Sequence, residues 1–337
     1  MHRRYTWILL LPLLGLLLLA DIFLGSVWLS PATVFQTLFE GYHTDSAAGL
    51  IVWEARMPRA VTALCAGMVL PVCGLMMQTF FRNPVAGPDI LGVSSGAGLA
   101  VAILTMGAGL TGWTATHQVS LILAATAGSV AVLLLMLVIA GKTRDAVTLL
   151  IIGLMVGAGV SALSGILQYF SNRDALRSFL LWSFGSLGGV TWTELIILLP
   201  AALFVVLLSW LMAKPLNLLL TGEQYAFTMG LSVRRARLLL VFVTGAGAGL
   251  VTAYCGPIAF VGIAVPHIAR MIWDTADHRT LVPATAVSGA AVMLLCDIIA
   301  QLPGYQTILP VNIITALLGA PFVIWLLVRS RRINNYF

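Results

Sequence analysis

Residues that could carry out catalysis are sparse in this sequence. It contains no HExxH zinc motif, no GxSxG nucleophile motif and no close pair of carboxylates within an apolar segment. Gly141, Lys142 and Thr143 resemble the end of a phosphate-binding Walker A loop, but Met136 stands where its first glycine belongs. An apolar helix is also predicted before this tripeptide, where the loop needs a strand. We therefore expect no catalytic residue, no metal site and no ATP site in this chain, so energy for pumping must come from an ion gradient or another subunit.

A few polar side chains interrupt the apolar segments. Asp297 lies in such a segment, where a carboxylate costs about 2.5 kcal/mol or more. It either binds a coupling proton or cation or pairs with a neighbouring helix, and the structural interpretation is favoured. His267, beside Pro266, is interpreted as a hydrogen-bonded group rather than a haem ligand. The four cysteines, which form no CxxC pair, are interpreted as small core residues: Cys65, Cys73, Cys255 and Cys296.

A stripe of small and polar residues predicts one special helix face. Its members follow one another at spacings of 4, 4, 3 and 4, which places them on the same side of a helix: Gly153, Gly157, Ser161, Ser164 and Gln168. Such a face avoids lipid, so it either lines a water-filled path or packs closely against another helix. Gly245 and Gly249 form a second pair, for which close packing is favoured.

The composition indicates the elements that must position these residues. Of 337 residues, 60% are hydrophobic and only 9% are charged, with a mean hydropathy of +1.02, whereas a soluble domain carries roughly 25% charged residues. A helix needs about 20 apolar residues to cross a bilayer. The apolar windows predict ten membrane-spanning helices, at about 7–29, 57–81, 91–110, 118–140, 147–170, 193–212, 236–254, 257–273, 281–301 and 309–329.

The basic residues indicate the orientation of these spans. With the amino terminus in the cytoplasm, 14 of the 18 Lys and Arg residues fall on the cytoplasmic side. The four on the other side are Arg56, Arg59, Arg173 and Arg177. The net charge of +6 is therefore interpreted as positive-inside sorting and not as a nucleic-acid surface. Residues 7–29 are too long for a cleaved signal peptide, so the first span is expected to be retained, with both termini cytoplasmic.

Two connections are too long to be simple turns. The external connection, about 30–56, contains Glu40, His43, Asp45 and Glu54, and the internal one, about 213–236, contains Glu223 and a group of arginines. Between the second and third spans, Pro84 and Pro88 stop a helix and predict a fixed turn. The whole chain, 1–337, is expected to form a single transmembrane domain.

Read together, several segments form a recognisable pattern. They are Arg56-Met57-Pro58-Arg59, then Gly67, Gly74 and Gln78, then Asn83-Pro84-Val85-Ala86-Gly87-Pro88, Leu91 to Ala97, Trp182 to Leu187, Gly256 to Gly262, Pro266-His267-Ile268-Ala269-Arg270, and Leu317 to Phe322. The pattern resembles the BtuC/FecCD-type permeases of ABC importers for iron-siderophores, haem and cobalamin. Val85 stands where the family usually has Leu. Asn83, Pro84, Pro88, Pro266, His267 and Arg270 are assigned a structural role within this motif.

The resemblance implies an all-α, ten-helix type II permease that forms a homodimer in the cell's inner membrane. Helix 147–170 would line the path between the two copies. Residues 219–230 fit the family's coupling segment, which docks on two ATPase subunits, through Gly222, Glu223, Ala226 and Gly230. The partner ATPases would use ATP and Mg, and this chain would bind no cofactor itself.

The resemblance also implies a docking surface for a substrate-binding protein at Arg56 and Arg59. The chain departs from the family here, because Gln301 stands where many members have a third arginine, and Ile308 to Asn312 replaces the common E-L-P-V-G. The expected cargo is a metal chelate, with a ferric siderophore or haem favoured over cobalamin. An ion-coupled secondary transporter using Asp297 is the main alternative, followed by an intramembrane enzyme.

Overall fold

The computed structural model is all-helical over the residues that it describes, 2–42, 46–111, 118–143, 145–301 and 308–329, which confirms the predicted fold class. Ten helices match the ten predicted spans: α1 (His2–Phe23), α4 (Met57–Phe81), α5 (Val93–Thr111), α6 (Gln118–Lys142), α7 (Ala146–Tyr169), α9 (Trp192–Leu211), α12 (Val233–Cys255), α13 (Val261–Trp273), α14 (His278–Ala300) and α15 (Val311–Arg329). Seven are long and apolar enough to cross a membrane, whereas the apolar parts of α5, α13 and α15 are shorter. The number of crossings therefore stays a prediction.

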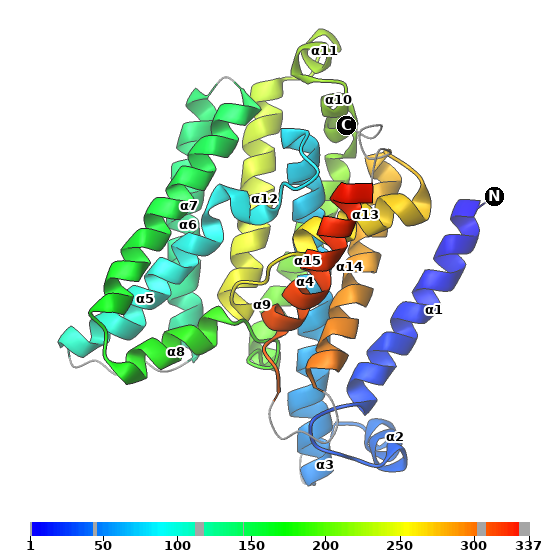
Figure 1. The fold of residues 1–337 in the computed structure, drawn as a ribbon. Helices are drawn as coiled ribbons and strands as arrows, with labels where there is room; N and C mark the ends of the chain where they lie inside the picture. The colour runs from blue at the N-terminus through cyan, green and yellow to red at the C-terminus, as the bar shows by residue number, and fades with distance from the viewer. Residues whose placement is uncertain (1, 43–45, 112–117, 144, 302–307, 330–337) are drawn as a thin grey trace.

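Shorter helices lie at both ends of the bundle (Figure 1). One end carries α2 (Pro31–Glu40), α3 (Ala47–Gly49) and α8 (Arg173–Ser183), and the opposite end carries α10 (Ala213–Leu220) and α11 (Glu223–Thr228). Periodicity missed these helices because they are short, although the caps of α2 and α8 are encoded locally. Ser30 accepts a hydrogen bond from the Thr33 N–H at 3.1 Å, and Asn172 accepts one from the Ala175 N–H at 2.9 Å.

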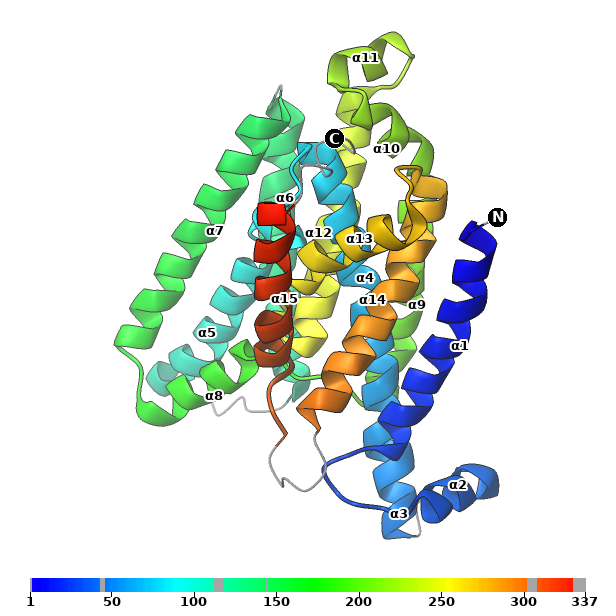
Figure 2. The same cartoon turned by 45° about the vertical axis from the view of Figure 1, so that its right-hand side comes forward.

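Helix α4 is the central helix of the bundle. It is surrounded by α9, α12, α13 and α14, whereas α1 and α7 lie at the periphery (Figure 2). In the continuous helical segment Ala47–Phe81, 83% of the most apolar window is buried, against 11% in α1 and in α7. The apolar faces that α1 and α7 leave exposed suit contact with lipid or with another protein chain.

Two glycine pairs let α4 approach its neighbours closely. A Cβ atom on Gly67 would lie 2.5 Å from the Gly289 carbonyl oxygen of α14, and one on Gly74 would lie 1.7 Å from the Gly262 carbonyl oxygen of α13. On the other side of the bundle, Gly245 and Gly249 of α12 pack on α6, which confirms the close packing expected for that pair. Small residues at such crossings allow the backbones to touch, and packing of this kind stabilises helix pairs in lipid.

The chain between α12 and α13 is not helical, so α13 begins at Val261 and not near residue 257 as predicted. Phe260 adopts a positive φ of 66°, and the Ala259 N–H donates a hydrogen bond to Asn312 Oδ1 at 2.9 Å. The Gly256-Pro257 step and these contacts end one helix and start the next within the bundle.

We expect Gly74→Ala to destabilise the protein by about 3 kcal/mol, because the new methyl group meets the α13 backbone at Gly262. Thermal unfolding in detergent, followed by size-exclusion chromatography after heating, measures the change. Gly15→Ala in α1 is the matched control, since nothing lies within 4 Å of the Cβ position there. An unchanged unfolding temperature for Gly74→Ala would contradict the observed contact with Gly262.

Candidate functional site

The turn between α4 and α5 is held from two sides. Within the turn, the Val85 N–H donates to Asn83 Oδ1 at 3.0 Å, and residues Pro88–Leu91 form a short 3-10 helix. From α13, His267 Nε2 lies 2.7 Å from the Pro84 carbonyl oxygen, which can only accept, so the imidazole donates. His267 is therefore a hydrogen-bonded structural group, as expected.

The remaining motif residues join α13 to α4. Arg270 Nη1 donates to Gln78 Oε1 at 2.7 Å, and Gln78 Nε2 donates to the Ile263 carbonyl oxygen at 3.0 Å. Pro266 lies inside α13, and the Pro88 ring lies against Gly262, where a Cβ atom would come within 2.7 Å of it. These contacts explain why the motif residues, though far apart in sequence, act as one structural unit.

Part of the small and polar stripe of α7 packs against the turn before α5 and the start of α5. A Cβ atom on Gly153 would lie 2.4 Å from the Ile90 carbonyl oxygen, and Gly157 lies against Gly92. The Ser161 hydroxyl donates to Ser95 Oγ at 3.2 Å. The two glycines thus make the internal helix contact that the sequence left open as an alternative. Lining of a path by the stripe stays a prediction.

The other two members of the stripe make no contact that distinguishes these alternatives. Ser164 is buried and donates to the Val160 carbonyl oxygen of its own helix at 3.2 Å, and Gln168 is half-buried. The face of α7 that is open in this chain is apolar instead, with Ile151, Met155, Leu163 and Ile166 all more than half exposed.

At the end of the bundle near α2, a buried ion pair joins α4 to α14. Arg59 Nε lies 2.9 and 2.8 Å from the two carboxylate oxygens of Asp297, and Arg59 Nη2 lies 2.6 Å from Oδ1. Gln301 Nε2 donates to Asp297 Oδ2 at 2.8 Å and to Asp21 Oδ1 of α1 at 3.3 Å. The structural interpretation of Asp297 therefore agrees with the geometry, and its partner is an arginine that the sequence assigned to docking.

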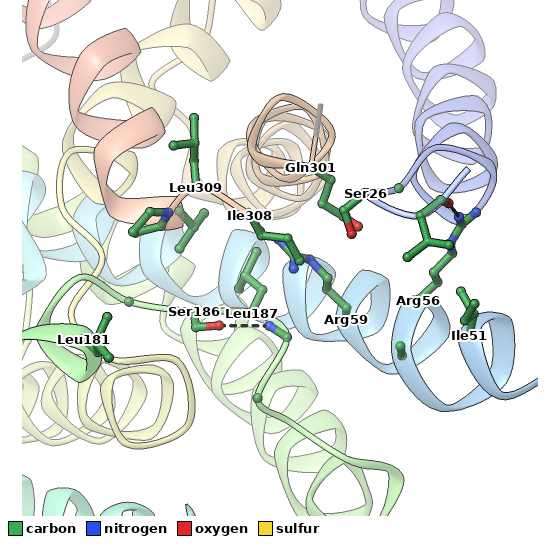
Figure 3. Close-up of a pocket in the computed structure, with 18 residues that line it drawn as sticks. Ser26, Ile51, Arg56, Arg59, Leu181, Ser186, Leu187, Gln301, Ile308 and Leu309 are labelled. Atoms are coloured by element: carbon green, nitrogen blue, oxygen red, sulfur yellow. Dashed lines mark hydrogen bonds between the residues drawn. The ribbon is translucent and has the colours of Figure 1, made fainter. Parts of the chain in front are cut away.

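Arg56 is also engaged within the chain. Its guanidinium donates to the carbonyl oxygens of Ile22, Phe23 and Val27 at 2.7, 2.9 and 2.6 Å, and so satisfies the carboxyl end of α1. Both arginines line a cavity of about 530 Å³ together with Ser26, Ser186 and Gln301 (Figure 3). Only 5% of Arg56 and 7% of Arg59 is exposed, so any docking partner meets them at the bottom of a cavity and not on an open rim.

The predicted coupling segment forms α10 and α11 at the opposite end of the bundle. Gly222 and Gly230, with φ of 104° and 84°, flank α11 in a backbone region that favours glycine. Ala226 of α11 is fully buried, whereas Tyr225, Phe227 and Met229 are exposed. Glu223, the first residue of α11, pairs with Arg237 of α12 at 3.1 Å, a partner that sequence reasoning missed.

Ligand-binding clusters are absent from the part of the chain that the structure describes. There, no three His, Cys, Asp or Glu side chains lie close enough to hold a metal ion, and all four cysteines are buried and free. His43, Asp45 and Arg144, which the sequence placed in connections, lie outside the described residues.

Comparison with known proteins agrees with this arrangement. A model of the FecCD transport family matches residues 13–329. The vitamin B12 import system permease proteins BtuC of Salmonella typhi and of Salmonella agona are each 38% identical over 337 residues, which covers 98% of this chain and 97% of each relative. A solved metal-chelate type ABC transporter in an inward-facing conformation is 28% identical, with a TM-score of 0.82, over 97% of this chain and 100% of that one.

The fold and these similarities define the permease subunit of an ABC importer, a translocating component without catalytic activity of its own. The chain belongs to the FecCD transport family. Permeases of this family are multi-pass proteins of the inner membrane that work with ATPase and substrate-binding partners, and the resemblance read from the motifs is confirmed.

We expect Asp297→Asn to destabilise the protein by about 3–5 kcal/mol, because it removes the carboxylate charge that directly contacts the buried Arg59 guanidinium. Chemical unfolding in detergent micelles measures the loss. Asp174→Asn on the exposed surface of α8 is the control and should stay near the wild-type value. Wild-type stability in Asp297→Asn would contradict the structural role of the Arg59–Asp297 pair and leave ion binding as the alternative for this carboxylate.

Proposed function

We propose that this permease imports a metal chelate and that cobalamin is the first candidate cargo, with a ferric siderophore or haem as the alternatives. The observation that carries this order is the 38% identity, over nearly the whole chain, to permeases named for vitamin B12 import. The sequence motifs do not distinguish these cargoes, and the expectation of an iron chelate rests only on the abundance of such members in the family. The cargo would be selected by the binding protein, and the path would hold it only weakly.

The energy would come from two ATPase subunits that use ATP and Mg and dock on α11, so the permease itself would need no cofactor. Three exposed apolar side chains, two on this short helix and one directly after it, support the assignment: Tyr225, Phe227 and Met229, which are 56, 71 and 59% exposed. Large apolar groups at the end of a polar loop are expected to be covered by a protein partner. Helix α1 begins and α15 ends in the same half of the bundle as α11 (Figure 1), which supports cytoplasmic termini.

A second copy of the chain would cover the apolar face of α7 and complete the path. The exposed side chains Ile151, Met155, Leu163 and Ile166 supply a suitable surface, and the region 1–337 would act as one transmembrane domain. At the external end, the binding protein would dock over the cavity that contains Arg56 and Arg59. Arg56, which donates to backbone carbonyl oxygens and not to a carboxylate, would favour an acidic partner surface there through long-range attraction.

We expect uptake into proteoliposomes only when three components are present: the permease with its ATPase, ATP inside, and a binding protein loaded with its cargo. Cyanocobalamin, haemin and a ferric siderophore are offered in turn, each on its candidate binding protein, and accumulated cargo is measured. Cyanocobalamin is expected to accumulate most. Liposomes with ADP in place of ATP are the control.

Two results would contradict parts of this proposal. Accumulation of only the haem or siderophore cargo would support the importer assignment but contradict cobalamin as its cargo. Uptake by the permease alone under an imposed ion gradient would instead support the secondary transporter. That alternative is not favoured, since Asp297 is already occupied by Arg59 and Gln301.

A further inference from the structure

Arg237, in the second turn of α12, connects two parts of the α11 end of the bundle. Its Nη2 atom donates to both carboxylate oxygens of Glu223, at 3.1 and 3.2 Å, and its Nη1 atom donates to the carbonyl oxygen of Thr143, directly after α6. The Arg237 side chain is 4% exposed, whereas that of Glu223 is 31% exposed. One guanidinium therefore holds the first residue of α11 and the carboxyl end of α6 at the same time.

The two segments that Arg237 joins are otherwise separated by a cavity of about 690 Å³. Glu223, Gln224 and Phe227 line it from the α11 side, and Gly141 to Thr143 line it from the α6 side. Glycines with positive φ flank α11, and the helix is otherwise held by its buried Ala226 and by packing on α10 and α12. Among the residues that the structure describes, the Arg237 guanidinium forms a polar contact across the cavity.

On the Thr143 side of this contact, the chain leads into a capped helix, α7. Asp145, two residues after Thr143, caps α7 by accepting hydrogen bonds from the Thr148 N–H at 2.7 Å and the Thr148 hydroxyl at 2.8 Å. These bonds lower the pKa of Asp145, and the positive charge of Arg237 acts in the same direction. Thr143 thus lies two residues before the capped start of α7, and α7 packs through Gly153 and Gly157 on the 88–92 turn.

We propose that Arg237 is a positioning residue that makes α11 and the α6–α7 turn move as one unit. A displacement of α11 would then be passed to the start of α7, and from there to the helix face packed on the 88–92 turn. An arginine suits this task because its planar fork binds a carboxylate through two bonds and still donates to a carbonyl group, which a lysine cannot reproduce. The inference rests on the proposed docking of the ATPase at α11.

Spin labels test the link without any cargo. Labels are placed on either side of the cavity at Gln224→Cys and Lys142→Cys, both exposed, while the native cysteines are buried and resist labelling. In the permease–ATPase complex, the label distance is measured by electron paramagnetic resonance with and without a non-hydrolysable ATP analogue. We expect the distance to be the same in both states. In Glu223→Gln and in Arg237→Lys it should differ between them.

Transport efficiency provides the second measurement. We expect cargo uptake per ATP hydrolysed to fall about fivefold or more in Glu223→Gln and Arg237→Lys, with the double variant no worse than either single one. Arg235→Lys, which makes the same exchange at an exposed position two residues away, should stay within about twofold of wild type. Cyanocobalamin on its binding protein is the cargo probe.

Distinct results separate the failure of this inference from the failure of the proposed function. A nucleotide-dependent label distance in the wild-type complex, or a constant one in Glu223→Gln, would overturn the link. Glu223 is partly exposed, so this variant is expected to fold even if Arg237→Lys does not. An ATPase that does not bind the permease would overturn the proposed docking at α11 and, with it, the role assigned to Arg237.

Discussion

Contact between the α4 backbone and its neighbours is the constraint on which the other features of this permease depend. At Gly67 and Gly74 the helix touches the carbonyl oxygens of α14 and α13, and any side chain there would separate them. Lipid provides no hydrophobic force between helices, so this packing has to supply much of the association. Once α13 is fixed against α4, its His267 can reach Pro84 and hold the α4–α5 turn, against which α7 packs.

The Arg59–Asp297 pair shows how the bundle tolerates charge at its core. Each ion alone would be expensive in an apolar surrounding, but two guanidinium nitrogens meet the carboxylate, and Gln301 satisfies its second oxygen. Gln301 replaces an arginine common in the family, and its amide also reaches Asp21 of α1. This uncharged side chain thus bridges α14 to the first helix and brings no positive charge of its own to the cavity.

Much of this fold could be predicted from the sequence, because hydrophobic length and periodicity determine helices in a membrane. The ten windows match helices, and motif resemblance found the family. Pairings could not be predicted in the same way, since Arg59 and Asp297 are 238 residues apart and only packing brings them together. For the same reason the α7 stripe could not be resolved, because Gly153 has the same spacing whether it faces a path or Ile90. Arg237 was hidden among three arginines within four residues.

The break between α12 and α13 has a consequence for hydration. Backbone amides freed at a broken helix inside a membrane normally require water or a polar neighbour. Here the Ala259 amide is bound by Asn312, a residue that stands where relatives commonly have glycine, which has no side chain to offer. The Asn312 amide oxygen therefore takes the place of a solvent molecule, and the Ala259 amide at the break needs no water as a partner.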